Sequence, residues 1–119
     1  MFGSGERVAT LTPDELKMRL ERGDPITVLD VREDDERNYS VIPLPGTARD
    51  LHIPMGEVVA RLDDVRAAAG ADLVVYCHHG VRSMTVANWL ARQGVPGVHN
   101  LTGGIDAWSV RVDPRVPRY

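Results

Sequence analysis

Short runs of apolar and β-branched residues alternate along this chain with segments whose apolar residues recur at helical spacing. The predicted strands cover residues 26–31, 51–53, 73–77 and 98–101. The predicted helices cover residues 13–22, 33–39, 57–69 and 83–92, with a short one around 107–108. This alternation is typical of an α/β layer with a mainly parallel sheet. Ligands bind such sheets outside the carboxyl ends of the strands, so functional residues are expected just after positions 30 and 76.

The size and composition of the chain fit one ordinary globular domain over residues 1–119. Hydrophobic residues make up 43% and charged residues 26%, which argues against intrinsic disorder. The net charge of −3 lacks the basic footprint of a nucleic-acid binder, and no apolar run approaches the ~20 residues of a transmembrane helix. We therefore expect no nucleic-acid or membrane partner. Residues 111–119, with Pro114 and Pro117, are predicted to form an extended C-terminal arm.

The chain has one cysteine, Cys77, so an intramolecular disulfide and a site built from two or four cysteines are excluded. The segment Met1–Arg7 lacks the basic and apolar regions of a secretory signal. A cytoplasmic, reducing location is therefore expected, in which a lone thiol stays free.

Cys77 stands where an apolar strand ends, and the loop His78–Ser83 follows it. Gly80 permits the positive φ of a tight turn, and such a strand–loop–helix connection tends to point successive backbone N–H groups inward. These amides, the positive end of the next helix and the Arg82 guanidinium all favour thiolate over thiol. Ser83 is suited to cap that helix. The sequence thus predicts a thiolate nucleophile, although a lone cysteine ending an apolar strand is more often a small buried hydrophobe.

Four segments of the chain resemble the motifs of rhodanese-like sulfurtransferases, in the order found in that family. They are Leu29–Glu33, His52–Glu57, Cys77–Ser83 and Leu101–Trp108, and the resemblance spans about residues 8 to 110. It implies an open, mainly parallel sheet of about five strands with helices on both faces. The segment Ser40–Thr47 departs from the family pattern, because the usual histidine is missing there.

The resemblance also implies a two-step transfer of sulfur through Cys77. Its thiolate would take the outer sulfur of a donor such as thiosulfate, hold it as a persulfide, and pass it to an acceptor. The implied partners are a small-molecule sulfur donor and an acceptor, which is cyanide, a thiol or a sulfur-accepting protein. No metal and no organic cofactor is implied.

The site residues expected from the sequence fall into three groups. The catalytic residue is Cys77. The residues expected to bind substrate are His78, His79, Gly80, Val81, Arg82 and Ser83. Asp30 and Arg32 are expected to support the crevice by pairing rather than by reacting. The two histidines either orient the donor and supply a proton or simply lie exposed at the mouth, and adjacent histidines seldom converge on one metal ion.

Two other functions remain open at the level of the sequence. One is a binding or regulatory module with the same fold and little activity, although such a module has no need of Cys77. The other is a phosphatase or arsenate reductase. The related dual-specificity phosphatases carry five residues between cysteine and arginine, whereas four separate Cys77 from Arg82. A shorter ring of amides suits a sulfur atom better than a phosphoryl group.

Overall fold

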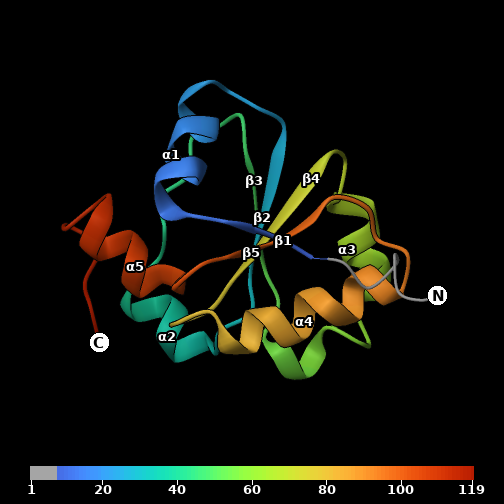
Figure 1. Cartoon of the computed structure of the whole chain (residues 1–119). Coiled ribbons are helices and arrows are strands. Elements are labelled where there is room, and N and C mark those ends of the chain that lie inside the picture. The colour runs from blue at the N-terminus through green and yellow to red at the C-terminus, as the bar shows by residue number, and fades with distance from the viewer. Residues whose placement is uncertain (1–7) are drawn as a thin grey trace.

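The computed structural model describes residues 8–119 (Figure 1). Residues 1–7, where the sequence predicts no signal segment, lie outside the described part. The elements in chain order are β1 (Ala9–Leu11), α1 (Pro13–Glu21), β2 (Ile26–Asp30), α2 (Asp34–Tyr39), β3 (Arg49–His52), the 3₁₀ helix η2 (Met55–Glu57), α3 (Leu62–Ala68), β4 (Asp72–Tyr76), α4 (Val81–Arg92), β5 (Val98–Leu101) and α5 (Gly104–Arg111).

All five strands are parallel and lie in the order β1-β5-β4-β2-β3, which confirms the predicted α/β class. The central strands β2 and β4 pair from Ile26 with Asp72 to Asp30 with Tyr76, so they end level with each other. The residues that follow them, Val31 and Cys77, therefore emerge at the same edge of the sheet. The short strand β1 is absent from the prediction, because only Leu11 of its three residues is buried.

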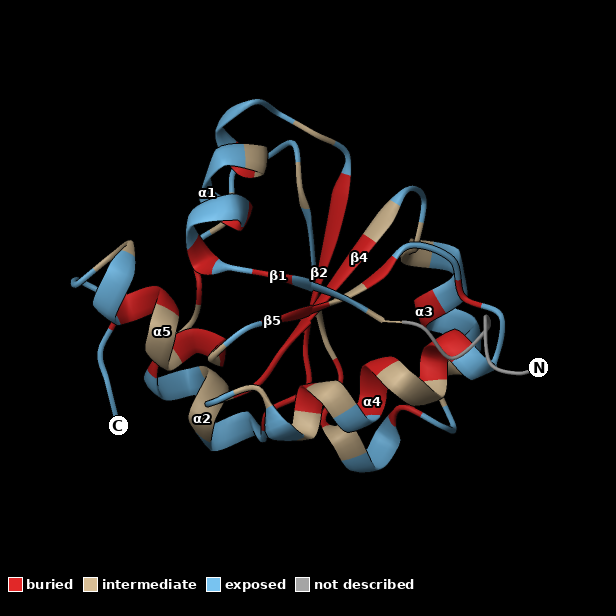
Figure 2. Cartoon of the chain, viewed as in Figure 1, coloured by how far each residue is buried: buried red, intermediate tan, exposed pale blue. Residues whose placement is uncertain are grey.

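Helices cover both faces of the sheet, and successive strand residues alternate between two apolar cores. Leu29 and Val75 pack in the core that includes residues of α3 and α4. Val28 and Val74 pack in the core that includes residues of α1 and α5. Figure 2 shows β2 and β4 buried along most of their length. Burial on both faces explains why these strands are nearly continuous apolar runs in the sequence.

The structure corrects three predicted helices. Residues 57–69 form η2, a turn and α3 rather than one helix, and Val59 in the turn is 68% exposed. Helix α4 begins at Val81 and its N-cap is Gly80, so the prediction of Ser83 as N-cap is wrong. Helix α5 extends to Arg111, which the sequence assigned to the C-terminal arm.

Residues 113–119 contain no helix or strand, and they fold back against the domain. Val116 is buried, and its carbonyl accepts a hydrogen bond of 2.6 Å from the Ser109 hydroxyl. Within residues 8–119, no helix is long and apolar enough to cross a membrane.

Candidate active site

The predicted cysteine loop lies between the end of β4 and the start of α4, where Gly80 makes the turn. Its φ of +102° is in the left-handed region that favours glycine. The turn also packs closely on the segment before α5. A Cβ atom on Gly80 would lie 3.3 Å from the amide nitrogen of Gly103 and 3.5 Å from the carbonyl oxygen of Leu101. The glycine therefore serves both the conformation of the loop and its close approach to the neighbouring segment.

Two backbone amides of this loop point at the cysteine sulfur. The N–H of Gly80 lies 3.1 Å and the N–H of Ser83 lies 3.3 Å from Cys77 Sγ. The amides of Val81 and Arg82 begin the 12-residue helix α4, and among the described residues they donate to no acceptor. Two N–H groups at this helix start thus contact the sulfur, and two more beside them in the chain have no acceptor, an arrangement that favours an anion there.

Neighbouring elements hold the peptide groups of the loop in this orientation. The carbonyl oxygens of Cys77 and His78 accept hydrogen bonds of 2.9 and 3.1 Å from the amides of Ile105 and Asp106, in the first turn of α5. These two hydrogen bonds fix the peptide groups that join Cys77 to His78 and His78 to His79 against α5. Gly104 makes the contact possible, because a Cβ atom there would lie 2.5 Å from the Cys77 carbonyl oxygen.

Asn100, at the end of β5, is a supporting residue that the sequence analysis missed. Its side-chain amide donates to the Gly80 carbonyl at 3.3 Å, and its Oδ1 accepts from the Ser83 hydroxyl at 2.5 Å. The same hydroxyl lies 3.3 Å from Cys77 Sγ. Ser83 therefore contacts the sulfur through both its amide and its side chain. A buried Asn at the carboxyl end of a strand was the signal that could have identified this residue.

The thiol itself is buried, since Cys77 is 1% exposed. Burial alone would fit a packing cysteine, but a packing cysteine does not require two amides directed at its sulfur. The polar contacts with Gly80 and Ser83 distinguish the two interpretations.

Arg82 is paired rather than free, which changes the electrostatics expected of the loop. Its guanidinium donates two hydrogen bonds, of 2.7 and 2.9 Å, to the carboxylate of Glu36 in α2. The hydrogen bond from Arg82 is the main cause that lowers the pKa of Glu36 to about 2. A full positive charge at the mouth of the loop is thus balanced by a carboxylate that the sequence analysis did not select.

Asp30 and Arg32, the residues expected to support the crevice, pair with each other in the interior. Arg32 donates to the Asp30 carboxylate through Nε at 2.9 Å and Nη2 at 2.8 Å, and both side chains are fully buried. Arg32 also donates to the carbonyl of Ser40 at 2.7 Å. The pair fixes the chain where it leaves β2, beside the cysteine loop: the amide of Val31 donates to the Tyr76 carbonyl at 3.1 Å.

The two histidines of the loop have different surroundings. His78 is half-buried, and burial followed by the proximity of His79 lowers its pKa below the usual value. His79 is exposed, and its Nε2 lies 3.8 Å from Asp106. One ligand atom from each of these three residues lies within 4.8 Å of the others, a spacing that a metal ion could use. The Asp106 carboxylate, however, is already held by Arg118 at 2.8 and 3.3 Å.

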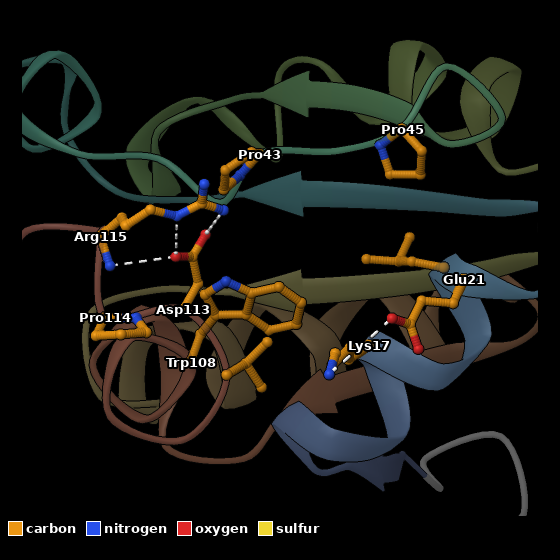
Figure 3. A pocket seen from close by; sticks show the side chains of 10 residues that line it. Lys17, Glu21, Pro43, Pro45, Trp108, Asp113, Pro114 and Arg115 are labelled. Atoms are coloured by element: carbon orange, nitrogen blue, oxygen red, sulfur yellow. Dashed lines mark hydrogen bonds and ion pairs between the residues drawn. The ribbon is translucent and has the colours of Figure 1, made fainter.

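A separate groove with a volume of about 490 Å³ lies between α1, α5 and the turn after α2 (Figure 3). The groove is lined by Trp108 of α5, Lys17 of α1 and Pro43, which Figure 3 labels, and also by Val112. None of the residues predicted for the site lines this groove. The cysteine loop is therefore separate from this groove.

Comparisons with known proteins agree with these features. The model of the rhodanese-like domain family matches residues 12–111. The "Rhodanese-like/PpiC domain-containing protein 12, chloroplastic" of Arabidopsis thaliana is 35% identical in an alignment 123 residues long, gaps included, which covers 96% of the chain but 38% of the plant protein. The "Putative sulfurtransferase YtwF" of Bacillus subtilis is 32% identical over 84% of the chain and 89% of that protein. A crystal structure of a rhodanese-like domain protein from Staphylococcus aureus has a TM-score of 0.75 at 28% identity and covers 94% of the chain and 99% of its own.

Proposed function

The chain belongs to the rhodanese-like domain family, and we propose that it is a sulfurtransferase that carries sulfur on Cys77. The similarity to the "Putative sulfurtransferase YtwF" of Bacillus subtilis supports this activity. The observation that carries the proposal is the pair of amides, from Gly80 and Ser83, at 3.1 and 3.3 Å from Cys77 Sγ. Amides in fixed positions stabilise negative charge on sulfur without reorganising during the reaction.

In the first step, the Cys77 thiolate attacks the outer sulfur of a donor such as thiosulfate. The S–S bond of thiosulfate breaks, sulfite leaves with the electron pair, and a persulfide forms on Cys77. Its terminal sulfur carries the negative charge. The amides of Val81 and Arg82, which have no acceptor among the described residues, are suited to bind that sulfur.

In the second step, a nucleophile such as cyanide or a thiolate attacks the terminal sulfur. The bond to Cys77 Sγ breaks, the Cys77 thiolate is restored, and thiocyanate or the persulfide of the acceptor leaves. The free thiol that this cycle requires suits a reducing compartment such as the cytoplasm. Neither step calls on a metal or an organic cofactor.

Intact-mass measurement after incubation with thiosulfate tests the proposal. We expect a gain of one sulfur atom that cyanide removes and that is absent from Cys77→Ser. An unchanged mass with thiosulfate and with a small persulfide as donors would contradict sulfur transfer and favour a binding module. A phosphatase assay run in parallel separates that module from a phosphatase.

A further inference from the structure

Residues 113–119 lie beyond the segment that matches the family model, and they return to the cysteine loop. Their end lies near α2 and α5 in Figure 1. Two contacts fix the path: the carbonyl of buried Val116 accepts from the Ser109 hydroxyl, and Arg118 forms a forked pair with Asp106 in the first turn of α5. Because the same turn of α5 binds the loop carbonyls, the tail is anchored directly beside the loop.

The ring of Tyr119 covers one side of the loop. It stacks on the ring of His78 with the centroids 3.9 Å apart and the planes 8° from parallel. On another side, Tyr39 of α2 meets it edge-on, at 5.8 Å between centroids. His78 is the residue directly after Cys77, so the stacked ring lies against the loop that holds the sulfur, and the sulfur is itself almost fully buried.

The hydroxyl of Tyr119 joins the two charged networks under the loop. It accepts a hydrogen bond of 3.0 Å from Arg32 and donates one of 2.8 Å to Glu36, which in turn holds Arg82. Tyr119 nevertheless remains 43% exposed. Water can therefore replace both hydrogen bonds, and the ring can leave without unpacking the core.

We propose that Tyr119 is a specificity-determining residue that limits the size of the acceptor reaching sulfur on Cys77. Slim nucleophiles such as cyanide pass the stacked ring, whereas bulky thiols react only after the ring has left His78. This selectivity rests on the proposed function for its sulfur chemistry. The steric effect of the Tyr119 ring does not depend on that function, because it applies to any reagent that attacks the thiol.

The single cysteine allows a test that does not depend on sulfur transfer. The rate of alkylation of Cys77 is measured with iodoacetamide, which is small, and with fluorescein maleimide, which is bulky. We expect Tyr119→Ala to raise the maleimide rate roughly tenfold, because opening no longer breaks the stacking contact and the two hydrogen bonds. The iodoacetamide rate is expected to change less than about twofold, since the thiol and its amides are unaltered.

Three further variants sharpen the test. Tyr119→Phe keeps the stacked ring and should give an intermediate maleimide rate. Arg118→Ala loosens the tether to Asp106 and should act in the same direction as Tyr119→Ala, which provides a second route if that variant is poorly folded. Arg115→Ala is the matched control, because Arg115 lies in the same segment with its side chain 88% exposed and, within residues 8–119, pairs only with Asp113.

If Tyr119→Ala raises the rate of Cys77 alkylation equally for both reagents, or for neither, the proposed size limit is wrong. Loaded protein extends the test to sulfur transfer: Tyr119→Ala should speed discharge to glutathione and leave discharge to cyanide unchanged. If the variants shift the alkylation ratio while no persulfide forms with any donor, the steric role stands and the sulfurtransferase proposal fails. If a persulfide forms and the ratio does not shift, sulfur transfer stands and the steric role fails.

Discussion

At the scale of single residues, the direction of a few peptide groups decides what Cys77 can do. The amides of Gly80 and Ser83 face its sulfur. The carbonyls of Cys77, His78 and Gly80 accept hydrogen bonds from neighbouring elements, which holds the loop in place. The same sulfur, equally buried but without those amides, would be a packing group. Charge is the second factor at this scale, because the loop's arginine is balanced by a carboxylate from α2.

The pair of Arg82 with Glu36 predicts opposite effects on the binding of an anionic donor. Arg82→Ala should raise the KM for thiosulfate, whereas Glu36→Gln should lower it about two- to fivefold at low ionic strength, because the guanidinium is then less neutralised. At high salt, Glu36→Gln should no longer lower the KM for thiosulfate. Steady-state kinetics of both variants and of the double variant test this, and the double variant should behave like Arg82→Ala. An unchanged KM in Glu36→Gln would contradict the prediction.

Glu36 also predicts a dependence of stability on pH. Its pKa is lowered from 4.5 to about 2 in the folded chain, mainly by Arg82. A lowered carboxyl pKa stabilises the fold above the unfolded value, and this contribution is lost as the pH falls from about 4.5 towards 2. Urea unfolding of the wild type should therefore lose more free energy between about pH 5 and about pH 3 than that of Glu36→Gln. Parallel losses in the two proteins would show that Glu36 makes no such contribution.

At the scale of elements, the site is the meeting point of two helix starts. Helix α4 supplies the amides that face the sulfur, and the first turn of α5 binds the carbonyls on the outer side of the loop. Neither element would position the loop alone, since a short loop after a strand can turn its peptides in several ways. Helix α5 can lie this close to the cysteine loop because residue 104 is a glycine, so a substitution of Gly104 tests the role of α5.

Gly104→Ala should disturb both the loop and the fold. The new Cβ would meet the Cys77 carbonyl at 2.5 Å, and the φ of +61° is unfavourable for alanine. We expect a loss of more than about 3 kcal/mol in the free energy of unfolding, together with loss of persulfide formation. Gly23→Ala is the matched control: its φ is +75°, but the Cβ would meet only Thr47 at 4.0 Å. It should cost about 1–2 kcal/mol and leave persulfide formation intact. Equal effects of the two changes would argue against the role of α5.

At the scale of the whole molecule, a buried charged network joins segments that are distant in the sequence. Arg32 contacts Asp30 beside it, Ser40 after α2 and Tyr119 in the tail. Through Tyr119 and Glu36 the network continues to Arg82 in α4. It thus connects β2, α2, α4 and the C-terminal segment around one end of the sheet.

Breaking this network should be costly. Arg32→Met removes the guanidinium that pairs with the buried Asp30 carboxylate. Among the described residues it leaves that carboxylate with the backbone N–H of residue 32 at 3.0 Å and Arg37 at 3.4 Å. We therefore expect a loss of about 3–5 kcal/mol in the free energy of unfolding. Arg22→Met is the control, since the side chain of Arg22 is 56% exposed and its pair with Asp24 is at the surface. It should cost less than about 1 kcal/mol. Urea denaturation compares the two, and similar losses would mean that the buried pair contributes little.

The α/β class, the parallel sheet and the position of Cys77 after a buried strand could all be predicted from the order of residues. These follow from local patterns: a continuous apolar run predicts a strand covered on both faces, and a glycine after its end predicts a turn. Local patterns were less reliable where burial decides the outcome. The apolar spacing of residues 57–69 predicts one helix, yet Val59 is exposed and the segment is broken.

The residues that surround the sulfur, and what they do there, became clear only from the packing of the elements. Asn100, Glu36 and Tyr119 lie 23, 41 and 42 positions from Cys77 in the sequence. No periodicity or spacing links them to the loop, because contacts between side chains of different elements depend on how those elements pack. Their partners, the Gly80 carbonyl, Arg82 and His78, were visible in the sequence, whereas the pairing was not. Local chemistry thus selects the candidate nucleophile, and packing determines its charge balance and its accessibility.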